Sequence, residues 1–166
     1  MSQPGPFQFR YDVTPDDRQR VREIVESTGF FNPEETGVAV ELVDERLAKG
    51  PSRGYHFVFA QQQGRSVGYT CYGPIAGTAG SYDLVWIAVD VSCQRQGLGR
   101  ILLEESERLV RAEEGRRIYI ETSNRGHYVP TRAFYERNGY ALEALLKDFY
   151  GPGDDKVIYA RDVAGE

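Results

Sequence analysis

Residues 84–103 read LVWIAVDVSCQRQGLGRILL, and this stretch decides the fold. It opens with a continuous apolar run at 84–89, which is typical of a strand buried on both faces. A polar segment with two glycines follows at 92–100, and apolar residues at helical spacing continue over 101–114. We therefore predict a strand, a tight turn and a helix. Such a turn directs unpaired backbone N–H groups and the positive end of the helix at one place, which suits an anion.

The turn contains the residue types that a phosphate site needs. Gly97 and Gly99 allow the backbone to approach a phosphate without an intervening Cβ, and Arg95 and Arg100 add local positive charge. A strand-to-helix turn without a ligand is the alternative interpretation of a lone Gly-x-Gly pair. The spacing excludes a Gly-x-Gly-x-x-Gly dinucleotide loop and a Gly-Lys-Ser/Thr nucleotide loop.

The composition of the whole chain indicates one globular domain over residues 1–166. With 40% hydrophobic and 27% charged residues, the chain can form a core and is not biased toward disorder. Its 20 basic and 25 acidic residues give a net charge of −5. This charge argues against duplex DNA as a partner, because binding to a phosphate backbone needs a cationic face. We therefore expect any phosphate site to be local.

Cysteine and histidine usage indicates neither a disulfide framework nor a metal site. Cys71 and Cys93 form no CxxC pair, and His56 and His127 add no metal-ligand spacing. No stretch reaches the roughly 18 apolar residues of a membrane helix, and residues 1–11 lack a signal-peptide pattern. We predict a cytoplasmic protein with no metal, no membrane and no nucleic acid among its partners.

The rest of the chain predicts strands and helices around a mixed sheet. The predicted order is β-α-α-β-β-β-α-β-α-β-β, with strands at 7–13, 56–61, 66–73, 82–89, 117–122, 140–144 and 156–161 and helices at 14–28, 32–49, 101–114 and 130–138. The hydroxyl of Thr14 is expected to cap the first helix. In the second helix, Val38, Leu42 and Leu47 share the apolar face. We expect residues 148–155 to form a loop between the last two strands.

Two motifs in this order carry a family resemblance. Residues 94–99, QRQGLG, match the Gln/Arg-x-x-Gly-x-Gly/Ala signature of the GNAT acyl-CoA-dependent N-acetyltransferases. Residues 132–140, RAFYERNGY, resemble the Ala-x-x-x-Tyr-x-x-x-Gly-Phe segment of the same family, with Thr131 where alanine is usual. The resemblance implies a mixed, mostly antiparallel sheet that splays between the fourth and fifth strands and is flanked by helices. It places the cofactor core at about 82–139.

The resemblance also implies a site for acetyl-CoA, with no metal. The pyrophosphate would bind backbone N–H groups of the turn, and the pantetheine arm would pair with the strand before it. Many GNAT members carry a cofactor-contacting asparagine seven residues before the motif tyrosine, where this chain has Tyr128, so the contact is either lost or made by Asn124. The implied cofactor-binding residues are Ile87, Ala88, Val89, Gln94, Arg95, Gln96, Gly97, Leu98, Gly99, Arg100, Asn124 and Tyr135.

Acetyl transfer needs a neutral amine and a protonated leaving thiolate, and the resemblance supplies candidates for both proton transfers. Tyr135, at the motif position, is implied as the acid for the thiolate. The base is either Glu121, at the end of its strand, or Asp83, at the start of the strand before the turn, or a water held by one of them. We rank Glu121 slightly first. In the alternative interpretation, Tyr135 is a packed aromatic residue, and Glu121 and Asp83 are structural carboxylates at strand ends.

The acceptor is an amine of unspecified identity. Phe30 and Phe31 between the first two helices, and Tyr150 with Phe149 near Asp154 and Asp155, are the substrate-binding candidates. Aromatics beside acids suit a cationic amine on a small molecule or a peptide N-terminus, and the second stretch is similar to that of ribosomal-protein alanine N-acetyltransferases. A degenerate acyl-CoA-binding sensor and a drug-modifying resistance enzyme are the competing functions. A homodimer is left open.

Overall fold

The computed structural model describes residues 6–165. Within that range the strands form one seven-stranded sheet of order β1-β2-β3-β4-β5-β7-β6, with β4 and β5 parallel and β1–β2, β2–β3, β5–β7 and β6–β7 antiparallel. This is the mixed sheet that the sequence predicts. The elements are β1 (Gln8–Arg10), α1 (Asp17–Ser27), α2 (Pro33–Lys49), β2 (His56–Gln62), β3 (Arg65–Pro74), β4 (Ser81–Val89), η1 (Val91–Cys93), α3 (Leu98–Ala112), β5 (Arg117–Ser123), η2 (Gly126–Tyr128), α4 (Val129–Arg137), β6 (Ala141–Gly151) and β7 (Asp154–Asp162).

The described chain divides into two compact units, and each is described by itself. The N-terminal unit contains residues up to 73 together with 86–106, and the C-terminal unit contains 74–85 together with 107–165. β4 and α3 pass from one unit into the other. No helix in the described part of the chain is both long and apolar enough to cross a membrane.

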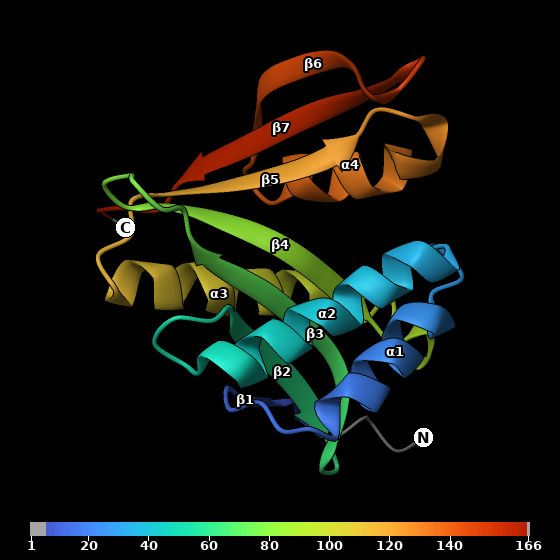
Figure 1. Cartoon of the computed structure of the whole chain (residues 1–166), viewed down its shortest axis with the longest axis vertical. Coiled ribbons are helices and arrows are strands. Elements are labelled where there is room, and N and C mark those ends of the chain that lie inside the picture. The colour runs from blue at the N-terminus through green and yellow to red at the C-terminus, as the bar shows by residue number, and fades with distance from the viewer. Residues whose placement is uncertain (1–5, 166) are drawn as a thin grey trace. The chain divides into compact units, whose positions relative to one another are not determined.

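In the N-terminal unit, α1 and α2 lie over one face of β2 and β3 (Figure 1). Alternation along β2 and β3 sends Phe57, Phe59 and Tyr69, each no more than 2% exposed, into a core with Val21 and Val43 from the two helices. A Cβ built on Gly68 would lie 3.1 Å from Leu102 of α3, so the start of α3 packs on the opposite face of β3.

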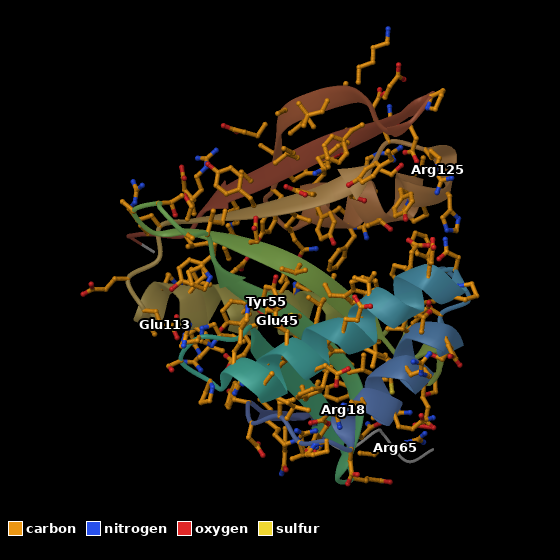
Figure 2. The ribbon with its side chains drawn as sticks, in the orientation of Figure 1. Arg18, Glu45, Tyr55, Arg65, Glu113 and Arg125 are labelled. Carbon is orange, nitrogen blue, oxygen red and sulfur yellow. The ribbon has the colours of Figure 1, made fainter. Side chains whose placement is uncertain are left out.

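Local sequence signals explain how α1 and α2 begin and end. Asn32 and Glu35 form a reciprocal capping box at the start of α2, and Gly29 and Gly50 follow the two helices with positive φ. Arg18 of α1, labelled in Figure 2, pairs with Asp44 of α2. The two helices are therefore tied to each other as well as to the sheet.

In the C-terminal unit, α4 and the end of α3 pack on one face of β5 and β7. The hydroxyl of Tyr159 on β7 donates to Glu136 of α4 at 2.9 Å, and the hydroxyl of Tyr140 donates to the buried Glu107 of α3 at 2.8 Å. Glu113, near the end of α3 in Figure 2, accepts from Tyr82 of β4 at 2.9 Å. The parallel register of β4 and β5 covers only Ser81–Asp83 against Arg117–Tyr119. This short pairing is the splay that the family resemblance implies.

Five expectations about the fold are wrong. Thr14 does not cap α1, because the carboxylate of Asp17 accepts from the Thr14 backbone N–H at 2.8 Å and reverses the expected bond. Val38 is 47% exposed, while Ala39 and Val43 are buried in its place. The first strand is only three residues long, and α3 begins three residues earlier than predicted, so that Gly99 and Arg100 lie in its first turn.

The fifth error concerns the last hairpin. β6 and β7 run on to Gly151 and Asp154, so the predicted loop at 148–155 shrinks to a turn at 152–153. Asp148 adopts a positive φ of 56°, and the β6–β7 register shifts between Leu146 and Gly151. This irregularity lets the strand continue through residues that looked like a loop. Tyr150 therefore lies on an edge strand and not in a loop.

Candidate active site

The turn between β4 and α3 has the geometry of an anion-binding loop. Arg95 and Gly97 adopt positive φ values of 66° and 76°, and residues 94–97 are exposed. Residues 98–100 form the first turn of α3, whose N–H groups have no partner within the helix. A residue other than glycine in the left-handed region is uncommon, and such strain is concentrated at functional sites. The predicted phosphate-binding residues therefore lie together at the N-terminus of α3, a helix of 15 residues. This end of α3 belongs to the N-terminal unit.

The strand before this loop is less buried than its sequence suggests. Ala88 is buried, but Ile87 and Val89 are only partly buried, and Val85 is 36% exposed. The prediction of a strand buried on both faces is therefore wrong. The carbonyl of Val89 accepts from the Gln94 side chain at 3.3 Å, so Gln94 is turned back onto its own strand.

An aromatic elbow joins α1 and α2 in the same unit. The rings of Phe30 and Phe31 meet edge to face at a centroid distance of 5.0 Å, and Phe31 lies 4.9 Å from the ring of Trp86 on β4. The indole Nε1 of Trp86 is buried without a hydrogen-bond partner. Sequence reasoning identified Phe30 and Phe31 but not Trp86, which it assigned to the core of the strand.

Tyr135 is a buried residue of α4 in the C-terminal unit. Its side chain is 5% exposed, and its ring lies 6.2 Å from the rings of both Tyr140 and Tyr159. Burial raises the pKa of its phenol well above the usual value. The hydroxyl therefore keeps its proton at every ordinary working pH, as a general acid must.

Asp83, Glu121 and Lys156 form a charged cluster across β4, β5 and β7. Asp83 pairs with Tyr119, and Glu121 lies two residues further along β5, so the two carboxylates share one face of the sheet. Lys156 Nζ lies 2.8 Å from Glu121 Oε2. Burial raises the pKa of Asp83, the negative charge of Glu121 raises it further, and Lys156 partly opposes both effects.

Lys156 also lies over Phe149 and Tyr150, the aromatic residues that the sequence predicts to bind a cationic substrate. Its ammonium lies 3.7 Å from the ring centroid of Phe149 and 5.7 Å from that of Tyr150. Its side chain is 12% exposed, whereas that of Glu121 is 49% exposed. An acceptor amine would therefore compete with Lys156 for the ring faces that its ammonium covers.

Asn124 is engaged within the C-terminal unit. Its side-chain nitrogen donates to Asp155 Oδ2 at 2.9 Å, and its side-chain oxygen accepts from the Asp155 backbone N–H at 3.0 Å. Beside it, Arg125, labelled in Figure 2, pairs with Asp154 at 3.4 Å. These bonds use one of the two amide N–H groups and one of the two acceptor sites of the oxygen, and a cofactor contact by Asn124 stays a prediction.

Comparison with known proteins identifies the family. Residues 53–142, more than half of the chain, match the family model of the acetyltransferase (GNAT) domain. The chain belongs to the GNAT acetyltransferase family. A protein from Desulfovibrio desulfuricans assigned to the same family is 53% identical, with a TM-score of 0.92 over 96% of this chain and all of its own. No curated protein matches the sequence at a significant level.

More distant GNAT structures share the fold. An aminoglycoside 6'-N-acetyltransferase complexed with coenzyme A is 20% identical, with a TM-score of 0.78 over 96% of this chain and 98% of its own. The ribosomal-protein-S18-alanine N-acetyltransferase from Escherichia coli is 20% identical, with a TM-score of 0.73 over 97% and 96% of the two chains. This GNAT protein is accordingly an N-acetyltransferase of that family. Nothing in these comparisons favours the degenerate sensor.

The GNAT chain contains one residue of the charged cluster that sequence reasoning missed. Lys156 reaches Glu121 only because β7 pairs with β5 in the register that places Lys156 opposite Ser123. No local pattern reveals a contact between residues 35 positions apart. No group of three or more His, Cys, Asp or Glu within residues 6–165 is arranged to hold a metal ion.

Proposed function

We propose that this enzyme acetylates a primary amine by direct attack on the thioester, with Asp83 as base and Tyr135 as acid. The amine nitrogen attacks the carbonyl carbon while its proton passes to Asp83, directly or through a water. The carbon–sulfur bond breaks, and the leaving thiolate takes the proton of Tyr135. The pyrophosphate of acetyl-CoA binds the N–H groups of residues 95–100, and the pantetheine arm pairs with residues 87–89.

The observation that carries the choice of base is the charged cluster on β4, β5 and β7. Glu121, which the sequence ranks first, is half exposed and held at 2.8 Å by Lys156. Asp83 is half-buried, and its raised pKa brings it closer to the range in which a carboxylate accepts a proton at neutral pH. Glu121 then acts on Asp83 through its charge. This arrangement supports Asp83 as the proton acceptor.

The acceptor is an amine on a small molecule or at a peptide N-terminus. The GNAT relatives named above acetylate nitrogen on an aminoglycoside and on an alanine of a ribosomal protein. The edge-to-face pair of Phe30 and Phe31, with Phe31 in tilted contact with Trp86, supports an apolar wall for the acceptor. Tyr150 is the candidate from β6. A cytoplasmic location, a single domain over 1–166 and a homodimer stay predictions.

The proposed function is tested by release of free coenzyme A thiol from acetyl-CoA. The purified protein is incubated with peptides, polyamines, amino acids or aminoglycosides, one class at a time. We expect one class to stimulate thiol release well above the rate of acetyl-CoA hydrolysis, with an acetylated amine as the second product. If acetyl-CoA binds and no amine class stimulates release, the sensor replaces the enzyme.

Gly97→Val is expected to weaken coenzyme A binding about tenfold, because the left-handed conformation costs an L-residue roughly 1–2 kcal/mol. A Cβ at Gly97 meets no protein atom within 4 Å, so the substitution strains the loop backbone at a φ of 76° without a clash inside the protein. Gly77→Val is the matched control, because Gly77 has a φ of 77° and equally open surroundings. The measurement is the coenzyme A dissociation constant by calorimetry. Normal binding by Gly97→Val would contradict the phosphate-loop assignment.

A further inference from the structure

Arg20 of α1 contacts Asp90, the residue at which the phosphate loop begins. The guanidinium Nε donates to the carbonyl of Ser66 on β3 at 2.7 Å, and Nη2 donates to Asp90 Oδ2 at 3.1 Å. The Arg20 side chain is 14% exposed, and its remaining ionic contact is to Glu23 at 3.7 Å. Arg20 therefore links one helix, one strand and the first residue after β4. All of these residues belong to the N-terminal unit.

Asp90, which Arg20 contacts, in turn accepts hydrogen bonds from residues of the loop. Its Oδ1 accepts from the Ser92 backbone N–H at 2.9 Å and from the Ser92 hydroxyl at 2.7 Å, while its carbonyl accepts from Cys93 at 2.9 Å. Burial disfavours the charge of Asp90, but the Ser92 hydrogen bonds and Arg20 together outweigh this and lower its pKa. Asp90 thus stays ionised and caps η1.

Ser27 forms a second contact from the end of the same helix. Its hydroxyl donates to the Ile24 carbonyl at 2.7 Å and accepts from the Val91 backbone N–H at 3.1 Å. Three consecutive residues are thereby held by side chains. Arg20 bonds Asp90, Ser27 bonds the Val91 backbone, and Asp90 bonds Ser92. The strained backbone at Arg95 begins only three residues later. A loop fixed in advance loses less entropy when it binds an anion.

We propose that Arg20 and Ser27 are positioning residues that hold the phosphate loop ready for the pyrophosphate of acetyl-CoA. This inference rests on the proposed function, because it assumes that residues 95–100 bind the pyrophosphate. Neither residue touches the reacting atoms. Their loss therefore weakens binding of the pyrophosphate of acetyl-CoA and leaves the rate of the chemical step unchanged.

The test compares two acetyl donors, acetyl-CoA and S-acetylpantetheine, which lacks the pyrophosphate. For Arg20→Met and Ser27→Ala we expect the KM for acetyl-CoA to rise about tenfold, equivalent to about 1.4 kcal/mol, with kcat unchanged. The KM for S-acetylpantetheine should stay within about twofold of the parent value. Arg20→Lys keeps a charge for Asp90 and should recover part of the loss. Arg22→Met is the control, because Arg22 lies on the same helix with an exposed pairing to Glu26 at 3.8 Å.

The two donors separate failure of this inference from failure of the proposed function. If the parent enzyme shows no preference for acetyl-CoA over S-acetylpantetheine, the phosphate-loop assignment itself is wrong. If the parent shows the preference and Arg20→Met and Ser27→Ala retain it, only the positioning role is wrong. Equal losses with both donors would assign Arg20 and Ser27 to general stability and overturn the inference. Ser27→Ala removes a single hydroxyl, so it decides the matter if Arg20→Met does not fold.

Discussion

Tyr135→Phe is expected to lower kcat about 10²-fold while coenzyme A binding stays nearly unchanged, because a general acid contributes roughly 10²–10⁴-fold. The hydroxyl that protonates the thiolate is lost, but the ring keeps its contacts at 6.2 Å with Tyr140 and Tyr159. Since burial raises the pKa of Tyr135, the phenol is protonated across the assay range and the loss should not depend on pH. Single-turnover thiol release measures the chemical step directly.

A matched substitution in the same aromatic cluster controls for this result. Tyr159→Phe removes a hydroxyl that donates to Glu136 at 2.9 Å and should reduce stability by about 1 kcal/mol with kcat retained. If Tyr135→Phe loses less than about threefold in kcat, the thiolate takes its proton from water and the range given for general acids does not apply. If the two variants lose kcat equally, the role of Tyr135 is packing.

The parts of the site that sequence predicts are those encoded within a few adjacent residues. The capping box of Asn32 and Glu35 lies within one turn, so the sequence places the start of α2 correctly. The turn from Gln94 to Gly99 likewise combines glycines and arginines in one short run. Its strained conformation at Arg95 and Gly97 agrees with a phosphate loop. Such features depend on backbone preferences and not on the rest of the fold.

The parts that sequence misses depend on register between distant strands. Lys156 meets Glu121 across 35 positions, and Arg20 meets Asp90 across 70. A one-residue shift of β7 would send Lys156 to the other face of the sheet, and no local pattern fixes that register. The irregularity near Asp148 has the same origin, since it turns an expected loop into paired strand. For these reasons the sequence could name both candidate bases, but its ranking of Glu121 first could not take the contact with Lys156 into account.

Asp83→Asn is expected to lower kcat/KM about 10³-fold near neutral pH and to abolish the acidic limb of the pH profile, within the usual range for a general base. Only the carboxylate form accepts a proton, so activity rises with pH through the pKa of Asp83. Burial and the charge of Glu121 raise that pKa, which places the limb above the ordinary aspartate range. The measurement is kcat/KM from low pH to neutral pH with the most reactive amine of the panel.

The neighbours of Asp83 should move this limb in opposite directions. Glu121→Gln removes a like charge, so the pKa of Asp83 falls and the limb shifts to lower pH. Lys156→Met removes an attractive charge, so the limb shifts to higher pH. Glu143→Gln is the control, because Glu143 is 48% exposed and pairs with Arg117 at 2.9 Å, much as Glu121 pairs with Lys156.

The pattern of the variants distinguishes the two carboxylates. If Glu121 were the base, Glu121→Gln would lose the acidic limb and Asp83→Asn would keep it, which reverses both expectations. Lys156 Nζ lies 2.8 Å from Glu121 Oε2, so Glu121 is already engaged in an ion pair within the protein. Asp83 has no such partner in direct contact among the ion pairs of the described residues. Burial and the charge of Glu121 raise the pKa of Asp83, and Asp83 is therefore the carboxylate that we expect to take the proton.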